Sequence, residues 1–188
     1  MKFNKPIGSF VVLTRNNQKE VFLVKRSDFP VWESQGGGIE DNETPSITAI
    51  REAYEETGFK VKILRKIAEH TNPNSNKITS HVFEGKYISG TFAPEYNGCE
   101  GKWFDVNNLP PQMTATRRMM IEDCLNNKNH LIIKPEIPAV SIQNLNLLFL
   151  LPLQSFKYIY NLIFKNGFLC FISITMICIF NLKISNIV

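Results

Sequence analysis

Three glutamates lie close together in one short segment: Glu52, Glu55 and Glu56. In a helix, residues three and four positions apart share a face, so these carboxylates would project together. Like charges this close repel one another, and a hard divalent cation relieves the repulsion because it prefers oxygen ligands. Mg²⁺ usually binds a few carboxylates together with substrate phosphates. The spacing therefore predicts a site for Mg²⁺, with Mn²⁺ as the alternative ion, and a pyrophosphate.

The flanking residues predict the helix that positions the carboxylates. Thr44 is a suitable N-cap, and Pro45 fits the first helical position, where its missing N–H costs nothing. Gly58 is a natural stop because glycine readily takes the left-handed conformation. We therefore expect a helix over residues 45–57. A second face carries apolar side chains at helical spacing, and we expect it to pack inward: Ile47, Ile50 and Tyr54.

A glycine loop precedes this helix. Three consecutive glycines, Gly36 to Gly38, allow close backbone approaches that side chains would block. Arg51 and Glu43 carry opposite charges and can pair, which would fasten the loop to the helix. The alternative interpretation of the acidic cluster is a solvated helix face. The glycine loop, the helix signals and the carboxylate spacing together argue against that alternative.

Residues 37–59 resemble the Nudix box, G-x5-E-x7-R-E-U-x-E-E-x-G-U, where U is a bulky apolar residue. The matching positions are Gly37, Glu43, Arg51, Glu52, Glu55, Glu56, Gly58 and Phe59. Ala53 is smaller than the usual aliphatic residue, and Gln35 stands where the family usually has proline. The wider resemblance to MutT-like Nudix hydrolases covers roughly residues 6–128 and does not extend into the rest of the chain.

The resemblance implies an α/β fold, an α/β/α sandwich around a mixed β-sheet. It also implies Mg²⁺-dependent hydrolysis of a phosphoanhydride bond in a nucleoside diphosphate derivative, either an NTP or dNTP or a nucleotide sugar such as ADP-ribose. The metal ligands it implies are the Gly36 carbonyl and the carboxylates of Glu52, Glu55 and Glu56. The residues with a structural role within the motif are Gly37, Glu43, Arg51 and Gly58.

The same resemblance suggests further residues of the site. Glu55 or Glu56 is a candidate general base, and in many family members a glutamate from a later loop acts instead, here Glu100 first and Glu95 second. Each of these two is otherwise an ordinary exposed loop residue. Three residues are candidates for substrate binding: Arg26, Phe29 and Trp32. The alternatives are a solvated strand end for Arg26 and core packing for Trp32.

The remaining pattern indicates a single domain of about 130 residues, over residues 1–130. Alternating or continuous apolar runs predict strands at 11–13, 21–24, 61–68, 78–88 and 101–105, the first two forming a hairpin. Residues 89–101 read as a long loop that helps to choose the substrate. Thr116 is the expected cap of a helix that ends near residue 127.

The composition changes after this domain. Residues 137–188 contain no acidic residue and only three charged ones, Lys157, Lys165 and Lys183. The domain is therefore nearly neutral, which argues against a nucleic-acid-binding face. For the apolar tail, residues 131–188, three interpretations stay open. The first is a membrane anchor through residues 167–182. The second is a segment packed on the domain or on a partner chain, and the third is a tail without selected structure.

Two further features concern compartment and assembly. The four cysteines form no C-x-x-C pair, which favours free thiols in a reducing compartment, and no signal peptide is visible. We therefore expect a cytoplasmic protein, membrane-associated if the tail is an anchor. Dimers are common in the family that the sequence resembles, so a homodimer is a possible assembly. The alternative functions are a non-catalytic nucleotide-sensing Nudix module and a protein tethered through its tail to a membrane or partner.

Overall fold

The computed structural model describes residues 7–95, 97–126, 130–137, 144 and 147. The chain divides into two compact units, Met1–Leu150 and Leu151–Val188, and the second lies outside the described residues, as do the proposed anchor and Cys170 and Cys178. None of the helices in the described part combines the length and apolar character needed to cross a membrane.

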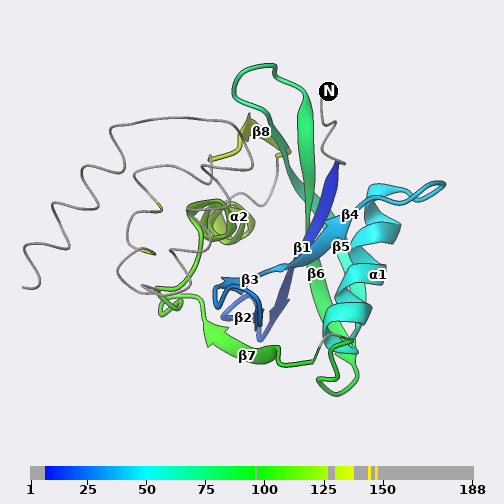
Figure 1. Ribbon diagram of the computed structural model, residues 1–188, viewed down its shortest axis with the longest axis vertical. Helices are drawn as coiled ribbons and strands as arrows, with labels where there is room; N and C mark the ends of the chain where they lie inside the picture. Colours follow the sequence, from blue (N-terminus) through cyan, green and yellow to red (C-terminus); the bar gives the residue numbers. More distant parts are fainter. Residues whose placement is uncertain (1–6, 96, 127–129, 138–143, 145–146, 148–188) are drawn as a thin grey trace, which may run out of the picture. The chain divides into compact units, whose positions relative to one another are not determined.

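A mixed β-sheet forms the centre of the first unit (Figure 1). The described residues contribute eight strands to it: β1 (Gly8–Arg15), β2 (Glu20–Lys25), β3 (Trp32–Glu33), β4 (Gln35–Gly38), β5 (Lys60–Thr71), β6 (Ile78–Ser89), β7 (Glu100–Asp105) and β8 (Ile132–Pro135). The main order is β3-β2-β1-β6-β5-β8, with β4 beside β1 and β7 beside β2. The β1–β6 and β5–β8 pairs are parallel, and the other pairs are antiparallel. The predicted hairpin is formed by β1 and β2.

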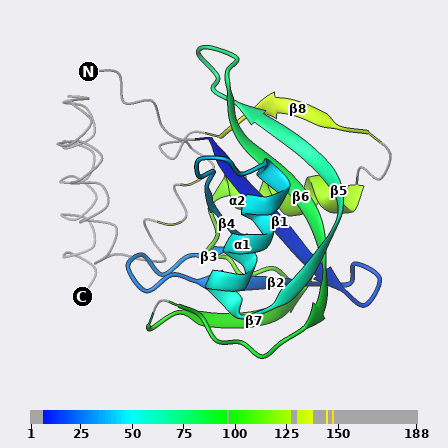
Figure 2. The same ribbon diagram turned by 90° about the vertical axis from the view of Figure 1, so that its right-hand side faces the viewer.

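Helix α1 (Pro45–Thr57) lies on one face of this sheet and helix α2 (Ala115–Asn126) on the other (Figures 1 and 2). Successive residues of a strand point to opposite faces. Val11 accordingly packs in a cluster with Ala49 and Ala53 of α1, whereas Val12 packs with Met120 of α2. The expected α/β/α sandwich around a mixed sheet is confirmed.

The prediction of the inward face of α1 is wrong. Ile47, Ile50 and Tyr54 are 51%, 41% and 57% exposed. The face that packs on the sheet carries small residues instead: Thr48, Ala49, Ala53 and Thr57. Small side chains let the helix approach the sheet closely, and this proximity brings its acidic face near the glycine strand β4. The helical spacing itself is correct. The rule that large apolar residues lie inside a protein selects the exposed face instead of the face with small residues.

The second helix is confirmed, but its predicted cap is two residues out of place. Thr114 lies just before α2, and its hydroxyl accepts a 3.4 Å hydrogen bond from the Arg117 N–H. Thr116 is buried, and its hydroxyl donates to the Ile137 carbonyl at 2.9 Å. A downstream residue also contributes to this end of the helix, because the Ala115 N–H donates to Asn144 Oδ1 at 2.7 Å.

Candidate functional site

The helix that carries the three carboxylates begins and ends as expected. Thr44 has an extended backbone, and its side chain accepts a hydrogen bond from the Ile47 N–H. Gly58 takes the left-handed conformation with φ of 73°, and its N–H donates to the Tyr54 carbonyl at 2.6 Å. These two ends set the register in which Glu52, Glu55 and Glu56 occupy the last two turns of α1.

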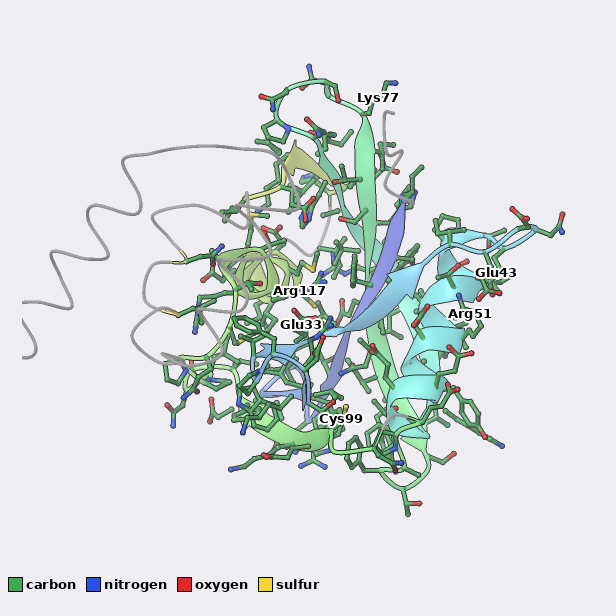
Figure 3. The ribbon with its side chains drawn as sticks, in the orientation of Figure 1. Glu33, Glu43, Arg51, Lys77, Cys99 and Arg117 are labelled. Carbon is green, nitrogen blue, oxygen red and sulfur yellow. The ribbon has the colours of Figure 1, made fainter. Side chains whose placement is uncertain are left out.

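Arg51 holds the loop before α1 onto the helix. Its Nε donates to one Glu43 oxygen at 2.8 Å and its Nη2 to the other at 2.9 Å, a bidentate pair. A longer bond joins Nη2 to the Gly38 carbonyl at 3.2 Å. The Arg51 hydrogen bonds lower the Glu43 pKa to about 2, and the same bonds raise the pKa of Arg51. The expected structural pairing of Arg51 and Glu43 is therefore present (Figure 3).

Arg51 also contacts the acidic cluster itself. Its Nη1 donates to Glu52 Oε1 and to Glu55 Oε2, both at 2.9 Å. Part of the repulsion expected among these carboxylates is thus relieved by the protein. Burial nevertheless raises the Glu52 pKa, against the opposing effect of Arg51.

Glu56 occupies a different environment from Glu52 and Glu55. Its carboxylate accepts a 3.0 Å hydrogen bond from the N–H of Gly36, which belongs to the glycine strand β4. Burial is the main cause that raises the Glu56 pKa to about 8, and the nearby charges of Glu52 and Glu33 add to the effect. Without a bound cation, this carboxyl therefore holds a proton near neutral pH.

Gly37 explains how the strand and the acidic helix come so close. A Cβ at this position would lie 2.3 Å from Glu52 Oε1, inside any allowed contact. Any larger residue would push the Glu52 carboxylate away from the strand. The match of Gly37 to the motif thus has a steric cause in the packing of β4 against α1.

The predicted residues only partly converge in one cavity. A cavity of about 650 Å³ is lined by Arg26, Gly36, Gly37 and Glu56, and also by residues that were not expected there, among them Glu33 and Arg117. Arg26 makes a bidentate pair with Asp28 at 2.8 and 2.6 Å. Glu52 lies beside Gly37, which lines the cavity, but Glu52 itself does not line it, whereas Glu55 faces Arg51.

The other predicted residues lie elsewhere. Glu100 is exposed, pairs with Lys25 at 3.3 Å, and lines a separate hollow together with Trp32. Trp32 is buried and packs edge-on against Phe104 with ring centroids 4.7 Å apart, as its alternative interpretation required. Phe29 is not among the residues that line either space, and its N–H donates to the Asp28 carboxylate at 2.9 Å. The catalytic and substrate-binding assignments of these residues stay predictions.

Glu33 and Arg117 were missed by reasoning from the sequence. Glu33 belongs to β3, and its position between Trp32 and the glycines was the available signal. Arg117 lies in the first turn of α2, far along the chain, and no spacing links it to the acidic cluster. Arg117 Nη2 lies 3.9 Å from Glu33 Oε2. Figure 3 labels the two residues close together beside α2.

The donor set fits a hard cation, although it is not assembled as a ligand cluster. Among the described residues, no three His, Cys, Asp or Glu side chains converge closely enough to hold a metal ion. Carboxylates and backbone carbonyls are nevertheless the ligands that Mg²⁺ prefers. Burial is the main cause of the raised pKa values of Glu52 and Glu56, and a bound cation would offset the cost of charging the two carboxyl groups.

Comparison with known proteins identifies the class. The chain belongs to the NUDIX domain family, whose model matches residues 5–124. It is 32% identical over 120 residues to the protein named "Putative 8-oxo-dGTP diphosphatase" of Bacillus subtilis (strain 168), covering 63% of this chain and 79% of that protein. It is 25% identical over 118 residues to the GDP-mannose pyrophosphatase of Cronobacter sakazakii, covering 57% of this chain and 62% of the relative.

A solved structure shares the fold. The ADP-ribose pyrophosphatase of Streptococcus suis superposes with a TM-score of 0.56 at 18% identity, over 69% of this chain and 99% of that one. These matches confirm the expectation of a Nudix-type pyrophosphohydrolase at the level of the enzyme class, and this family generally uses a divalent metal.

Proposed function

We propose that this protein hydrolyses a phosphoanhydride bond in a nucleoside diphosphate derivative with the help of Mg²⁺. The observation that carries the proposal is the Glu56 carboxylate, which faces the same cavity as Arg26 and has a pKa raised to about 8 by burial and by neighbouring carboxylates. The substrate range we propose is an NTP or dNTP or a nucleotide sugar. Relatives named for 8-oxo-dGTP and GDP-mannose support this range.

The residues divide the work as follows. Glu52, Glu55 and Glu56, with the Gly36 carbonyl, would hold the ion, which neutralises phosphate charge and activates a bound water when present. Arg26 would contact the substrate phosphates, since a guanidinium suits bidentate contact with phosphate. Glu56 would accept the proton of the attacking water, because its carboxylate lies in the same cavity as Arg26. Glu55 and Glu100 are the alternative bases.

A substrate panel tests the proposal. The full chain would be incubated with Mg²⁺ and dNTPs, oxidised dNTPs, ADP-ribose, dinucleoside polyphosphates or nucleotide sugars, and the products read by ³¹P NMR. We expect turnover that EDTA abolishes. Turnover that survives EDTA would exclude the metal-dependent mechanism. Binding of nucleotide without turnover would favour the sensing module over the enzyme.

A matched pair of variants tests the site. Glu56→Gln should lower kcat by about 10² or more, in line with the usual contributions of acid–base and electrostatic groups. Glu122→Gln changes an exposed glutamate on α2 and should leave kcat unchanged. Equal rates in both variants would contradict the assigned role of Glu56.

For the compartment, we propose the cytoplasm. The support is that Cys99 and Cys124 are free thiols, which is the usual state in a reducing compartment.

A further inference from the structure

Arg117 presents an incompletely bonded guanidinium to the cavity. Its side chain is 16% exposed, and the central carbon lies 3.8 Å from the ring centroid of Phe10, which fixes the plane of the group. Within the described residues, its side-chain hydrogen bond goes to the thioether of Met120 at 3.4 Å, a weak acceptor. Glu33 at 3.9 Å is too far for a hydrogen bond. Buried guanidinium groups normally have strong acceptors.

Two buried hydroxyls in the same cavity also lack partners. Ser34 and Ser80 are each 3% exposed, both line the cavity, and neither hydroxyl has a hydrogen-bond partner among the described residues. Buried polar groups are usually hydrogen-bonded, so these two hydroxyls leave bonding capacity unused in the wall of this cavity. Ser80 lies beside Gly8, which is two residues along β1 from Phe10. The unsatisfied groups therefore extend along the strand from the Arg117–Phe10 stack.

The neighbouring carboxylate of Glu33 limits the charge of a ligand that binds beside Arg117. Glu33 Oε2 lies 3.9 Å from Arg26 and 3.9 Å from Arg117. An anion bound against Arg117 would be repelled by Glu33, so a second phosphate is disfavoured. A neutral ring that offers an acceptor to the guanidinium and donors to the carboxylate suits both groups at once. Glu56 and Gly36 lie in the same cavity, so such a ring would be within reach of a phosphate chain held there.

Purine bases differ in the order of hydrogen-bond acceptors and donors along the edge that would face these two residues. Guanine has a keto acceptor at O6, next to donors at N1–H and the 2-amino group, whereas adenine has a donor 6-amino group and an acceptor N1 at the same positions. An arginine beside a glutamate matches the guanine order and is mismatched at both positions by adenine. Hypoxanthine keeps O6 and N1–H but lacks the 2-amino donor.

We propose that Arg117 and Glu33 form a base-reading subsite that selects guanine nucleotides, with Arg117 donating to O6 and Glu33 accepting from N1–H and the 2-amino group. This assignment rests on the proposed hydrolysis of nucleotides. Arg117 and Glu33 are specificity residues and take no part in bond cleavage.

The first test uses the unaltered full chain. With Mg²⁺, kcat/KM should fall about tenfold from GTP to ITP and about a hundredfold from GTP to ATP, the usual effect of leaving buried polar groups unpaired. Equal kcat/KM for GTP and ATP would overturn the inference. If no nucleotide is hydrolysed, the proposed function fails, and calorimetric binding of GMP and AMP without metal decides the subsite separately. GMP should then bind about tenfold tighter, and equal affinities would overturn it.

The second test compares neighbouring arginines on α2. Arg117→Met retains an apolar stem over Phe10 and should lower kcat/KM for GTP about tenfold or more while ATP changes less than about twofold. Arg118 instead donates to the Pro110 carbonyl at 2.9 Å and does not line the cavity, so Arg118→Met should retain the GTP-to-ATP ratio. An equal loss for GTP and ATP in Arg117→Met would indicate a structural role and overturn the assignment.

Discussion

At the scale of single residues, Glu56 links the protonation of the site to the stability of the fold. Its pKa of about 8 lies above the ordinary glutamate value of 4.5. Between these values the folded chain holds a proton that the unfolded chain has released. Folding stability without metal must therefore fall as pH rises through this interval, since the unfolded state then binds fewer protons than the folded state.

This linkage gives a measurable pH dependence. Without divalent cations, the Tm should decrease from about pH 5 to about pH 8 through Glu56, and Glu56→Gln should flatten this part of the profile. Added Mg²⁺ should raise the Tm more at the upper end, where the carboxylate is charged. Thermal unfolding monitored by circular dichroism at several pH values measures both effects. Identical profiles for the unaltered protein and Glu56→Gln would contradict the assigned pKa.

Arg51 gives a second prediction at this scale. Arg51→Lys loses the planar fork that contacts Glu43, Glu52 and Glu55, and should lower the free energy of unfolding by about 1–3 kcal/mol. Arg15→Lys is the control, because Arg15 makes a bidentate pair with Glu20 on a more exposed surface, where ion pairs add little stability. Urea unfolding measures the free energy of unfolding of both variants. An equal decrease in the two would show that the Arg51 contacts stabilise the fold no more than an exposed ion pair does.

Local spacing predicted the site only where its residues share one helix. Glu52, Glu55 and Glu56 are neighbours through the helical repeat, and Arg51 reaches Glu43 across one loop. Arg117 and Glu33 meet only because α2 packs across the sheet from β3, and no local pattern contains that information. The separation of Glu100 from Glu56 has the same origin, since the path of the loop before β7 depends on tertiary packing.

At the scale of elements, α1 shows how residue size sets the distance between a helix and a sheet. Ala53 is fully buried near Val11 and Phe83, whereas Ile50 is 41% exposed. Ala53→Leu should therefore overpack this layer and cost about 1–3 kcal/mol. Ile50→Gln should change stability by less than about 0.5 kcal/mol, as surface substitutions usually do. Chemical denaturation measures both, and the opposite order would restore the original assignment of the faces.

The elements themselves were largely predictable because each has a local signal. Thr44, Pro45 and Gly58 mark both ends of α1, and the alternation at 61–68 lies within β5. The short strands β3, β4 and β8 were not predicted. The glycine-rich strand β4 and the two-residue strand β3 carry too little side-chain pattern, and they are strands because neighbouring strands satisfy their backbone groups.

At the scale of the whole molecule, the sheet and core use residues beyond the expected limit at 130. β8 pairs with β5, Asn144 accepts from the first turn of α2, and Leu147 is 6% exposed. The limit of the domain stays a prediction. These contacts nevertheless show that part of the segment expected as a tail belongs to the first compact unit, which reaches Leu150.

Two shortened chains make this testable. A chain that ends at Leu150 should unfold at nearly the same temperature as the full chain. A chain that ends at Glu136 loses the Asn144 cap and the buried Leu147 side chain, and should be less stable by about 2 kcal/mol or more. Calorimetry of both proteins supplies the measurement. Equal stability of the two chains would mean that neither contact matters.

The hydrogen bond from the Ala115 N–H to Asn144 has a consequence for selectivity. Ala115 begins the same helical turn that carries Arg117, so the bond joins Asn144 to the turn that holds the arginine that we assign to base reading. A truncation before Asn144 should then reduce the selectivity between purines. Hydrolysis itself should continue, because Arg51 separately holds the acidic helix in place. Base selectivity would thus depend on the Asn144 contact and turnover on the Arg51 contacts, so mutations could change one property without changing the other.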